Sequence, residues 1–233
     1  MPLLVVAATG LELSAALGVK ADGPQGAVVE LSAHGRLVLG LVTGIGMVNA
    51  ALELGRALTR PDVTGVVDFG VAGSFDLGAH PVGCVRLLDQ ECWPEYGLLT
   101  TGSPAADALG LGFALNGVPK TAADAVFDHL AWSGPAELSA MGLYAQGWIP
   151  AAGLTVSGVT ADAQRAALLC QRYGPRLENM EGFALAYGAR RAGLPFAELR
   201  AVSNPVGLRP PKGWDLPGAL AALGQAARLL LAP

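Results

Sequence analysis

The stretch LENMEGFALAYGARRAGLPFAELRAVSN, residues 177–204, decides the fold because it joins a strand, a helix and a second strand within 28 residues. Its apolar pattern predicts these elements near 176–179, over 181–192 and over 196–203. Glu181 falls in the first turn of the helix, where the helix dipole favours an ionised carboxylate. Asn204 follows the second strand. Ligands of α/β sheets bind at the carboxyl ends of strands, so both side chains are site candidates.

The same alternation of apolar strands and helical patterns runs through the rest of the chain. Further strands are expected at 3–8, 28–31, 36–42, 64–69, 82–88 and 153–158, and further helices at 11–18, 47–60, 161–173 and 217–231. The Gly-, Pro- and Ala-rich region 93–150 is expected to hold loops, a strand and a short helix. No linker or internal repeat divides the chain, so residues 1–233 are expected to form one three-layer αβα sandwich around a mixed, mainly parallel sheet.

The composition favours a well-packed protein that binds a small molecule. Apolar residues make up 52% of the chain, charged residues 15%, and the net charge is −4, which disfavours disorder and nucleic acid as the main partner. The start MPLLVVAATG lacks the basic segment of a signal peptide, and the apolar C-terminal run is interrupted, so we expect a cytoplasmic protein that is not inserted in a membrane. The three cysteines form no CxxC pair, and we expect no metal site.

The segment TGIGMVNAA, residues 43–51, places two glycines before a helix. The N–H groups at the start of that helix suit an anion or a hydroxyl-rich group, which makes Gly44 a candidate for substrate binding. A tight strand-to-helix turn without a ligand is the alternative. The segment matches neither a Walker loop nor a dinucleotide fingerprint.

The segment DFGVAGSF, residues 68–75, is poor in bulky side chains after its second residue. Gly70, Ala72 and Gly73 leave room for a flat ligand to approach the backbone. A β-bulge or an ordinary loop would also explain the small residues.

Glu181 has the chemistry to hold a sugar. An ionised carboxylate only accepts hydrogen bonds and can take two of them from the cis-diol of a ribose. A helix-start glutamate without a ligand is the alternative. Met180 is either a core residue or a sulfur contact to a sugar face, and Glu178 is expected to be an ordinary surface or strand-end charge.

These segments together resemble the nucleoside phosphorylase and nucleosidase superfamily, through the MEG and RAVSN motifs, TGIGMVNAA and VAGSF. Within it, ENMEG, RYGP and SNPVGLRPPKGWDLPGAL are most similar to the futalosine hydrolase family. The resemblance covers nearly the whole chain and is weakest over 93–150. It implies an N-glycosyl hydrolase that releases hypoxanthine from futalosine in menaquinone biosynthesis, without a cofactor, as a homo-oligomer.

The resemblance also implies residue roles. Glu12 would position the attacking water, Glu181 would hold the ribose hydroxyls, and Met180 would lie under the sugar. Ala72 and Gly73 would lie beside the base and the ribose, and Val159 and Thr160 would contact the base. Asn204 takes the place of the aspartate that adenine-specific nucleosidases use against the purine N7.

The amide at position 204 favours an oxygen-bearing purine. A carboxylate would face the O6 atom of hypoxanthine lone pair to lone pair, whereas an amide donates to O6 and accepts from N7–H of the protonated base. An unpaired buried polar group costs about 1–3 kcal/mol. A strand-end Asn that opens a turn before Pro205 is the alternative. Arg209 and Lys212 are candidate partners for a carboxylate on the 5′ substituent, with a solvated loop as the alternative.

Three other functions fit parts of this pattern. A phosphorolytic enzyme is disfavoured, because Asp68 and Phe69 stand where arginine-using members of the superfamily carry their arginine and because Glu12 would repel phosphate. An adenine-releasing nucleosidase for methylthioadenosine or S-adenosylhomocysteine is disfavoured by Asn204. A nucleoside-binding protein without catalysis is disfavoured by the presence of both Glu12 and Glu181.

Overall fold

The computed structural model describes residues 2–21, 23–103, 105–119, 121, 124–144, 147–174, 176–209 and 213–233. The strands in this part of the chain are β1 (Leu3–Ala7), β2 (Val28–Ala33), β3 (Arg36–Val42), β4 (Val66–Ser74), β5 (Val85–Cys92), β6 (His129–Ala131), β7 (Pro150–Thr155), β8 (Leu177–Asn179) and β9 (Phe196–Pro205). The helices are α1 (Gly10–Leu17), α2 (Met47–Ala57), α3 (Ala108–Leu111), α4 (Gly134–Ala140), α5 (Ala163–Tyr173), α6 (Gly182–Arg191) and α7 (Leu216–Leu231).

The strands form one mixed sheet in the order β2-β3-β1-β4-β8-β7-β5-β6, and β9 pairs with both β4 and β5. β1 pairs in parallel with β3 and β4, and β4 pairs in parallel with β9, whereas β9 is antiparallel to β5. Because β9 links β4 to β5, the strands β4, β9, β5, β7 and β8 close into a ring. The prediction of a mixed sheet is confirmed, and the ring is a feature that the sequence pattern did not indicate.

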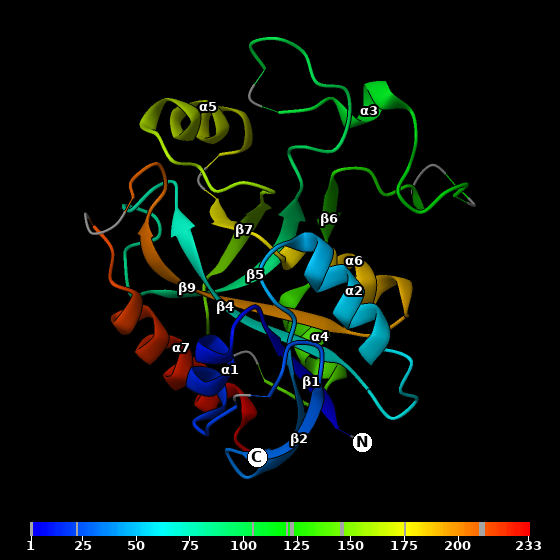
Figure 1. Ribbon diagram of the computed structural model, residues 1–233, viewed down its shortest axis with the longest axis vertical. Coiled ribbons are helices and arrows are strands. Elements are labelled where there is room, and N and C mark those ends of the chain that lie inside the picture. The colour runs from blue at the N-terminus through cyan, green and yellow to red at the C-terminus, as the bar shows by residue number, and fades with distance from the viewer. Residues whose placement is uncertain are drawn as a thin grey trace.

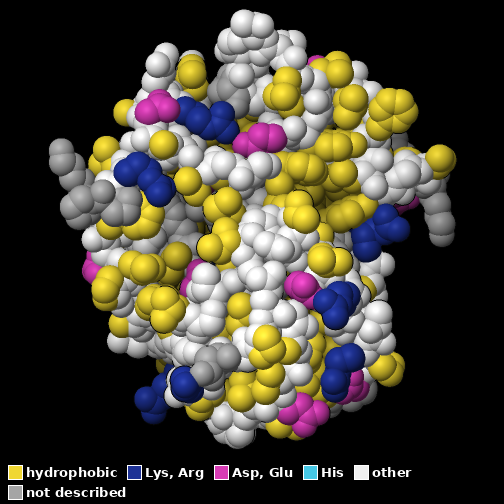
Figure 2. Space-filling model, in the orientation of Figure 1, with side chains coloured by type: hydrophobic (Ala, Val, Ile, Leu, Met, Phe, Trp, Pro, Cys, Tyr) yellow, Lys and Arg dark blue, Asp and Glu magenta, His cyan; other side chains and the backbone are white. Residues whose placement is uncertain are grey.

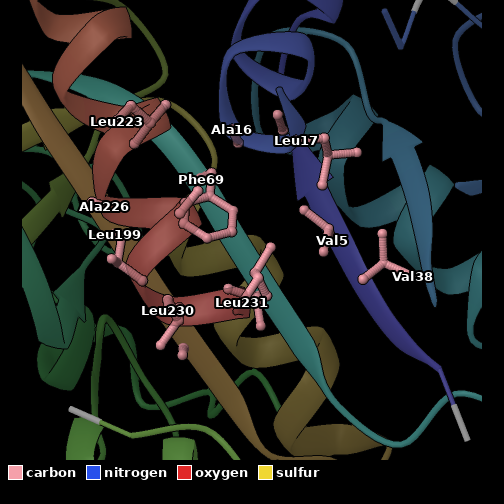
Figure 3. Close-up of a cluster of buried hydrophobic side chains, with 14 of the residues drawn as sticks. Val5, Ala16, Leu17, Val38, Phe69, Leu199, Leu223, Ala226, Leu230 and Leu231 are labelled. Carbon is pink, nitrogen blue, oxygen red and sulfur yellow. The ribbon is translucent and has the colours of Figure 1, made fainter. Parts of the chain in front are cut away.

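Helices cover both faces of the sheet, as the three-layer prediction requires (Figure 1). On one face, α1, α4 and α7 contribute to a large apolar cluster with β1 and β4, and on the other, α2 and α6 pack over the second cluster. Figure 3 shows the first cluster, in which Leu223 and Leu231 of α7 lie around Phe69 of β4. These faces are buried because apolar residues recur at helical spacing along each helix.

β4 runs five residues beyond its predicted end at residue 69. Its pairing with β9 contains a register shift, after which Gly73 lies opposite Asn204, and on its other side Gly73 lies opposite Glu178 of β8. A slip of one residue moves a side chain to the opposite face of a sheet, so this bulge determines the face on which Asn204 lies. Asn204, Gly73 and Glu178 therefore share one face.

The other differences from the predicted elements are small. The strands predicted at 82–88 and 153–158 are β5 and β7, displaced by about three residues, and the region 93–150 holds β6 together with two short helices, α3 and α4. The helix predicted to begin at Glu181 begins one residue later. Within the described residues, every helix is too short or too polar to cross a membrane.

Candidate active site

A cavity of about 340 Å³ opens where β1, β4 and β9 end, a volume within the range of small-molecule sites. Glu12, Glu181 and Asn204, the three predicted catalytic residues, all line it. The predicted substrate-binding residues that also line it are Ala72, Gly73, Val159, Thr160, Met180 and Arg209. Gly44 is not among its lining residues, whereas the neighbouring Ile45 is.

Glu181 occupies the N-cap position of α6, but its carboxylate accepts no hydrogen bond from the N–H groups at the start of the helix. The N–H groups that begin the helix are bound by other side chains: Oδ1 of Asn179 accepts from the N–H groups of Glu181 and Gly182, at 3.0 and 2.8 Å, and Oγ1 of Thr155 accepts from Phe183, at 2.8 Å. Because neighbours satisfy these donors, the Glu181 carboxylate is available to the cavity.

The N–H groups expected to receive a ligand at the start of α2 instead hold a protein carboxylate. The backbone N–H of Gly46 donates to Oε1 of Glu181 at 2.7 Å. Gly44 has a φ of 84°, and a side chain at this position would collide with Gln25, so this glycine serves the turn. Burial raises the pKa of the Glu181 carboxyl, and Arg200 and the Gly46 N–H oppose the rise.

Glu12 lies in the first turn of α1 and forms a capping box with Thr9. Its Oε2 atom accepts from the backbone N–H of Thr9 at 3.0 Å and from the Thr9 hydroxyl at 2.7 Å, while Oε1 accepts from the Val71 N–H at 3.0 Å. A carboxylate has about four acceptor positions. Glu12 is thus fixed between α1 and β4 and retains capacity to accept a hydrogen bond from a water.

Asn204 is held by contacts that orient its amide. The hydroxyl of Ser203 donates to Oδ1 at 2.7 Å, and Nδ2 donates to the carbonyl oxygen of Pro205 at 3.0 Å. Because the Pro205 carbonyl only accepts, the NH2 group must face it. The side chain is 8% exposed and lines the cavity, and each end of the amide still has a hydrogen-bonding position for a ligand.

Two glycines of β4 provide space beside these groups. A Cβ atom at Gly73 would lie 3.1 Å from Nδ2 of Asn204 and 2.9 Å from Val206. A Cβ atom at Gly70 would overlap the guanidinium of Arg200 and would lie 3.4 Å from Oε1 of Glu12. The small residues of this segment therefore make room for functional side chains as well as for a ligand. A β-bulge is also present, in the partner strand β9, where Ser203 is inserted between the partners of Ala72 and Gly73.

A fully buried ionic group underlies the site. The guanidinium of Arg200 on β9 is ion-paired to Asp68 and, at 2.7 Å, to Oε1 of Glu198, and each of these side chains is 1% exposed or less. Burial alone would lower the pKa of Arg200, but Asp68, Glu198 and Glu181 raise it, so the guanidinium stays charged. Arg200 thus places a positive charge beside Glu12 and Glu181, from beneath Gly70.

Two buried carboxyl groups meet under the start of α6. Glu91 accepts hydrogen bonds from Thr155 and Asn179, and burial raises its pKa to about 7, while burial raises the pKa of Glu198 to about 8. A Cβ atom at Gly182 would lie 2.5 Å from an oxygen of Glu198 and 2.6 Å from an oxygen of Glu91. The glycine after Glu181 is therefore required by space, and the network fixes Asn179, which in turn fixes the backbone of Glu181.

Arg209 lies at the exposed rim of the cavity. Its guanidinium carbon lies 5.8 Å from the ring centre of Trp214, whose Nε1 donates to the carbonyl oxygen of Leu208 at 2.9 Å. Trp214 also lines the cavity. Lys212, the second candidate for the 5′ substituent, lies outside the described residues.

The sequence interpretation missed Arg200, Glu198, Glu91 and Asn179. A signal was present, because Glu198 and Arg200 are charged residues in an otherwise apolar strand pattern, and Asp68 interrupts another. Buried charges are paired, so charges in two buried strands indicate a pair between them. Ser203 and Pro205 have no such signal, since their contacts with Asn204 depend on the bulge in β9.

Residues 2–229 match the phosphorylase superfamily. The chain belongs to this superfamily. A futalosine hydrolase from Streptomyces coelicolor is 38% identical over 97% of the chain and 93% of the relative, and one from Thermus thermophilus is 37% identical over 82% of the chain and 80% of the relative. Both likenesses confirm the superfamily predicted from the MEG and RAVSN motifs.

The solved structures show the same superfamily fold. The 5′-methylthioadenosine/S-adenosylhomocysteine nucleosidase from Neisseria meningitidis, in complex with methylthio-immucillin-A, superposes with a TM-score of 0.71 at 18% identity and covers 98% of this chain and 97% of its own. At this identity the likeness concerns the fold alone. It confirms the α/β fold class with a mixed sheet.

Proposed function

We propose that this chain hydrolyses the N-glycosidic bond of futalosine and releases hypoxanthine. The observation that carries the proposal is the meeting of Glu12, Glu181 and Asn204 in one cavity, each held by contacts that leave hydrogen-bonding capacity toward the ligand. The futalosine hydrolases from Streptomyces coelicolor and Thermus thermophilus, related over most of the chain, support the choice of substrate.

The chemistry of the bond assigns a role to each group. Cleavage of an N-glycosidic bond has an oxocarbenium-like transition state, by analogy with glycoside hydrolysis. Glu181 holds the ribose hydroxyls, Glu12 binds the water that attacks C1′ and takes its proton, and Asn204 stabilises the departing base through O6 and N7–H. An amide is a poor proton donor, so the proton that reaches N7 comes from solvent water, and the proton that Glu12 takes from the attacking water returns to solvent in exchange.

Phosphorolysis is the rival within the superfamily. An arginine does reach the site, from β9, but Asp68 and Glu198 are both paired to it. Burial raises the pKa of Asp68, and the nearby carboxylates of Glu198, Glu181 and Glu12 raise it further. A phosphate would therefore meet more negative than positive charge, and water is the better nucleophile for this site.

The assay that tests the proposed function is incubation of the purified protein with futalosine. Chromatography should show stoichiometric hypoxanthine and dehypoxanthine futalosine, at the same rate with or without phosphate. In parallel, methylthioadenosine should be cleaved at least about 100-fold more slowly, because its base lacks O6. Release of a sugar 1-phosphate would identify a phosphorylase, preference for methylthioadenosine would identify an adenine-releasing enzyme, and nucleoside binding without turnover would identify a binding protein.

The surface of α2 supports a homo-oligomer as part of the same proposal. Val48 and Leu52 lie four residues apart on one side of the helix, with exposed fractions of 83% and 56%, and Ile45, just before the helix, is 59% exposed. Figure 2 shows hydrophobic side chains gathered between the positions of α2 and α3 in Figure 1. Since Ile45 also lines the cavity, a second copy of the chain packed here would close the site.

Charge on this surface should break the assembly. The variant Val48→Asp is expected to shift the protein from a dimer or larger oligomer to a monomer in light scattering with size-exclusion chromatography, because association would bury an unpaired carboxylate. Val29→Asp, at an exposed position of β2 away from the cavity, is the matched control. A wild-type monomer, or an unchanged mass for Val48→Asp, would contradict the proposed interface.

A further inference from the structure

Two polar atoms in the cavity wall stand out because they are buried and unsatisfied. Oε2 of Glu178 and Oγ1 of Thr160 have no hydrogen-bond partner within the described part of the chain. The two residues are 7% and 3% exposed, and both line the cavity. Buried polar atoms in native proteins nearly always have a partner, so an orphaned carboxylate oxygen in a binding cavity indicates a donor supplied by the ligand.

The other oxygen of this carboxyl group is already fixed. The backbone N–H of Thr160 donates to Oε1 of Glu178 at 3.1 Å. Burial raises the pKa of Glu178, and the nearby hydroxyl of Thr160, the Thr160 N–H and the charge of Arg165 oppose the rise. The carboxyl group is therefore anchored through Oε1, with Oε2 as the atom that remains for a ligand.

The position of Glu178 in the sheet relates it to Asn204. β8 and β9 flank β4, and Gly73 lies opposite Glu178 on one side and opposite Asn204 on the other. Adjacent strands lie about 4.8 Å apart, so the two residues start about 10 Å apart on the same face, with a glycine between them. A flat bicyclic base above Gly73, with a hydrogen bond at each side, fits this gap.

We infer that Glu178 is a specificity-determining residue, whose Oε2 accepts the N1–H hydrogen bond of a 6-oxopurine while Asn204 reads O6 and N7. The inference rests on the proposed function, which supplies the base. Hypoxanthine carries a hydrogen on N1, whereas adenine presents a lone pair there, so a carboxylate at this position favours the first and disfavours the second. Glu178 was expected from the sequence to be an ordinary surface or strand-end charge. In this assignment it is a second residue, after Asn204, that recognises the base.

Binding of free bases to the purified protein tests this assignment directly. By calorimetry, the wild type should bind hypoxanthine about 10- to 100-fold more tightly than 1-methylhypoxanthine, which lacks the N1 hydrogen. The variant Glu178→Ala should bind both bases within about threefold of each other, because the acceptor for N1–H is gone. If Glu178→Ala keeps the full wild-type preference, the assignment is wrong.

The isosteric variant Glu178→Gln provides a test that does not depend on a truncated side chain. The Thr160 N–H would hold the carbonyl of the new amide, so its NH2 would face the base and meet N1–H of hypoxanthine donor to donor. The ratio of kcat/KM for futalosine to that for methylthioadenosine should fall about 10- to 100-fold. A loss of activity that is equal for both substrates would show a structural role only and would overturn the inference.

The control is Glu137→Gln, the same substitution at a half-buried glutamate that accepts a hydrogen bond from the Phe196 N–H at 3.1 Å outside the cavity lining. It should leave unchanged both the ratio of affinities for the two free bases and the ratio of kcat/KM for the two nucleosides, and an equal effect in this variant would overturn the inference.

The role of Glu178 and the proposed function can be refuted separately. A protein that releases hypoxanthine from futalosine but binds both free bases equally would refute the role of Glu178 alone, whereas a protein that neither cleaves futalosine nor binds hypoxanthine would refute the proposed function.

Discussion

Replacing Glu12 with glutamine is expected to lower kcat for futalosine about 10²- to 10⁴-fold, the usual contribution of a general base. The carboxylate is the acceptor for the Thr9 N–H, the Thr9 hydroxyl and the Val71 N–H. A glutamine can accept on one end only, so its NH2 group would face one of these donors and could not take a proton from water. Rates under saturating substrate give kcat, and calorimetry with hypoxanthine reports whether the base still binds.

The control for this variant is Glu30→Gln, the same change on a carboxylate of β2 whose side chain is 65% exposed. It should have wild-type kcat and thermal stability, since exposed ion pairs contribute little. Near-normal turnover by Glu12→Gln would remove Glu12 from the proposed mechanism. Loss of hypoxanthine binding together with turnover would indicate instead that the substitution has disturbed the contact between α1 and β4.

The local elements of the fold were predictable because each has a strong sequence period. Apolar runs mark β1 and β9, and helical spacing marks α6 and α7. β4 was predicted too short because Gly70, Ala72 and Gly73 have low strand propensity, and its extension comes from pairing with β9 along its whole length. The ring of strands depends on the antiparallel pairing of β9 with β5, a contact between distant segments that no local pattern encodes.

The site was predictable where a single side chain carries the chemistry, and less so where one residue acts through another. Glu12, Glu181 and Asn204 were predicted as a group, and the structure places them in one cavity. Arg200 acts through its pair with Asp68 on a neighbouring strand, so its charge in an apolar strand indicates a buried pair but not the partner. Asn179 acts by holding the backbone N–H of Glu181, a role that its sequence position alone does not give. Gly44 was predicted to bind substrate, but its neighbour Gly46 binds Glu181 instead.

The largest change in specificity is expected from Asn204→Asp. A carboxylate at this position would face O6 of hypoxanthine, so the ratio of kcat/KM for futalosine to that for methylthioadenosine should fall about 100-fold or more. The change also places a carboxylate oxygen against the Pro205 carbonyl, 3.0 Å from the present Nδ2 atom, where two acceptors repel. Overall activity should therefore fall as well, and both substrates must be measured with the same enzyme preparation.

The control for this variant is Asn116→Asp, which shows how much stability is lost when an asparagine amide outside the cavity is replaced by a carboxylate. Like Asn204, Asn116 donates from Nδ2 to a backbone carbonyl, that of Asp124 at 2.7 Å, but it lies outside the cavity lining. Its substitution should lower thermal stability by the amount expected for one lost hydrogen bond, about 1 kcal/mol, and leave the substrate ratio unchanged. If Asn204→Asp behaves in the same way, its amide is structural, and the choice between hypoxanthine and adenine is made elsewhere in the cavity. A ratio that shifts only in Asn204→Asp ties that choice to the amide that Ser203 and Pro205 hold in place.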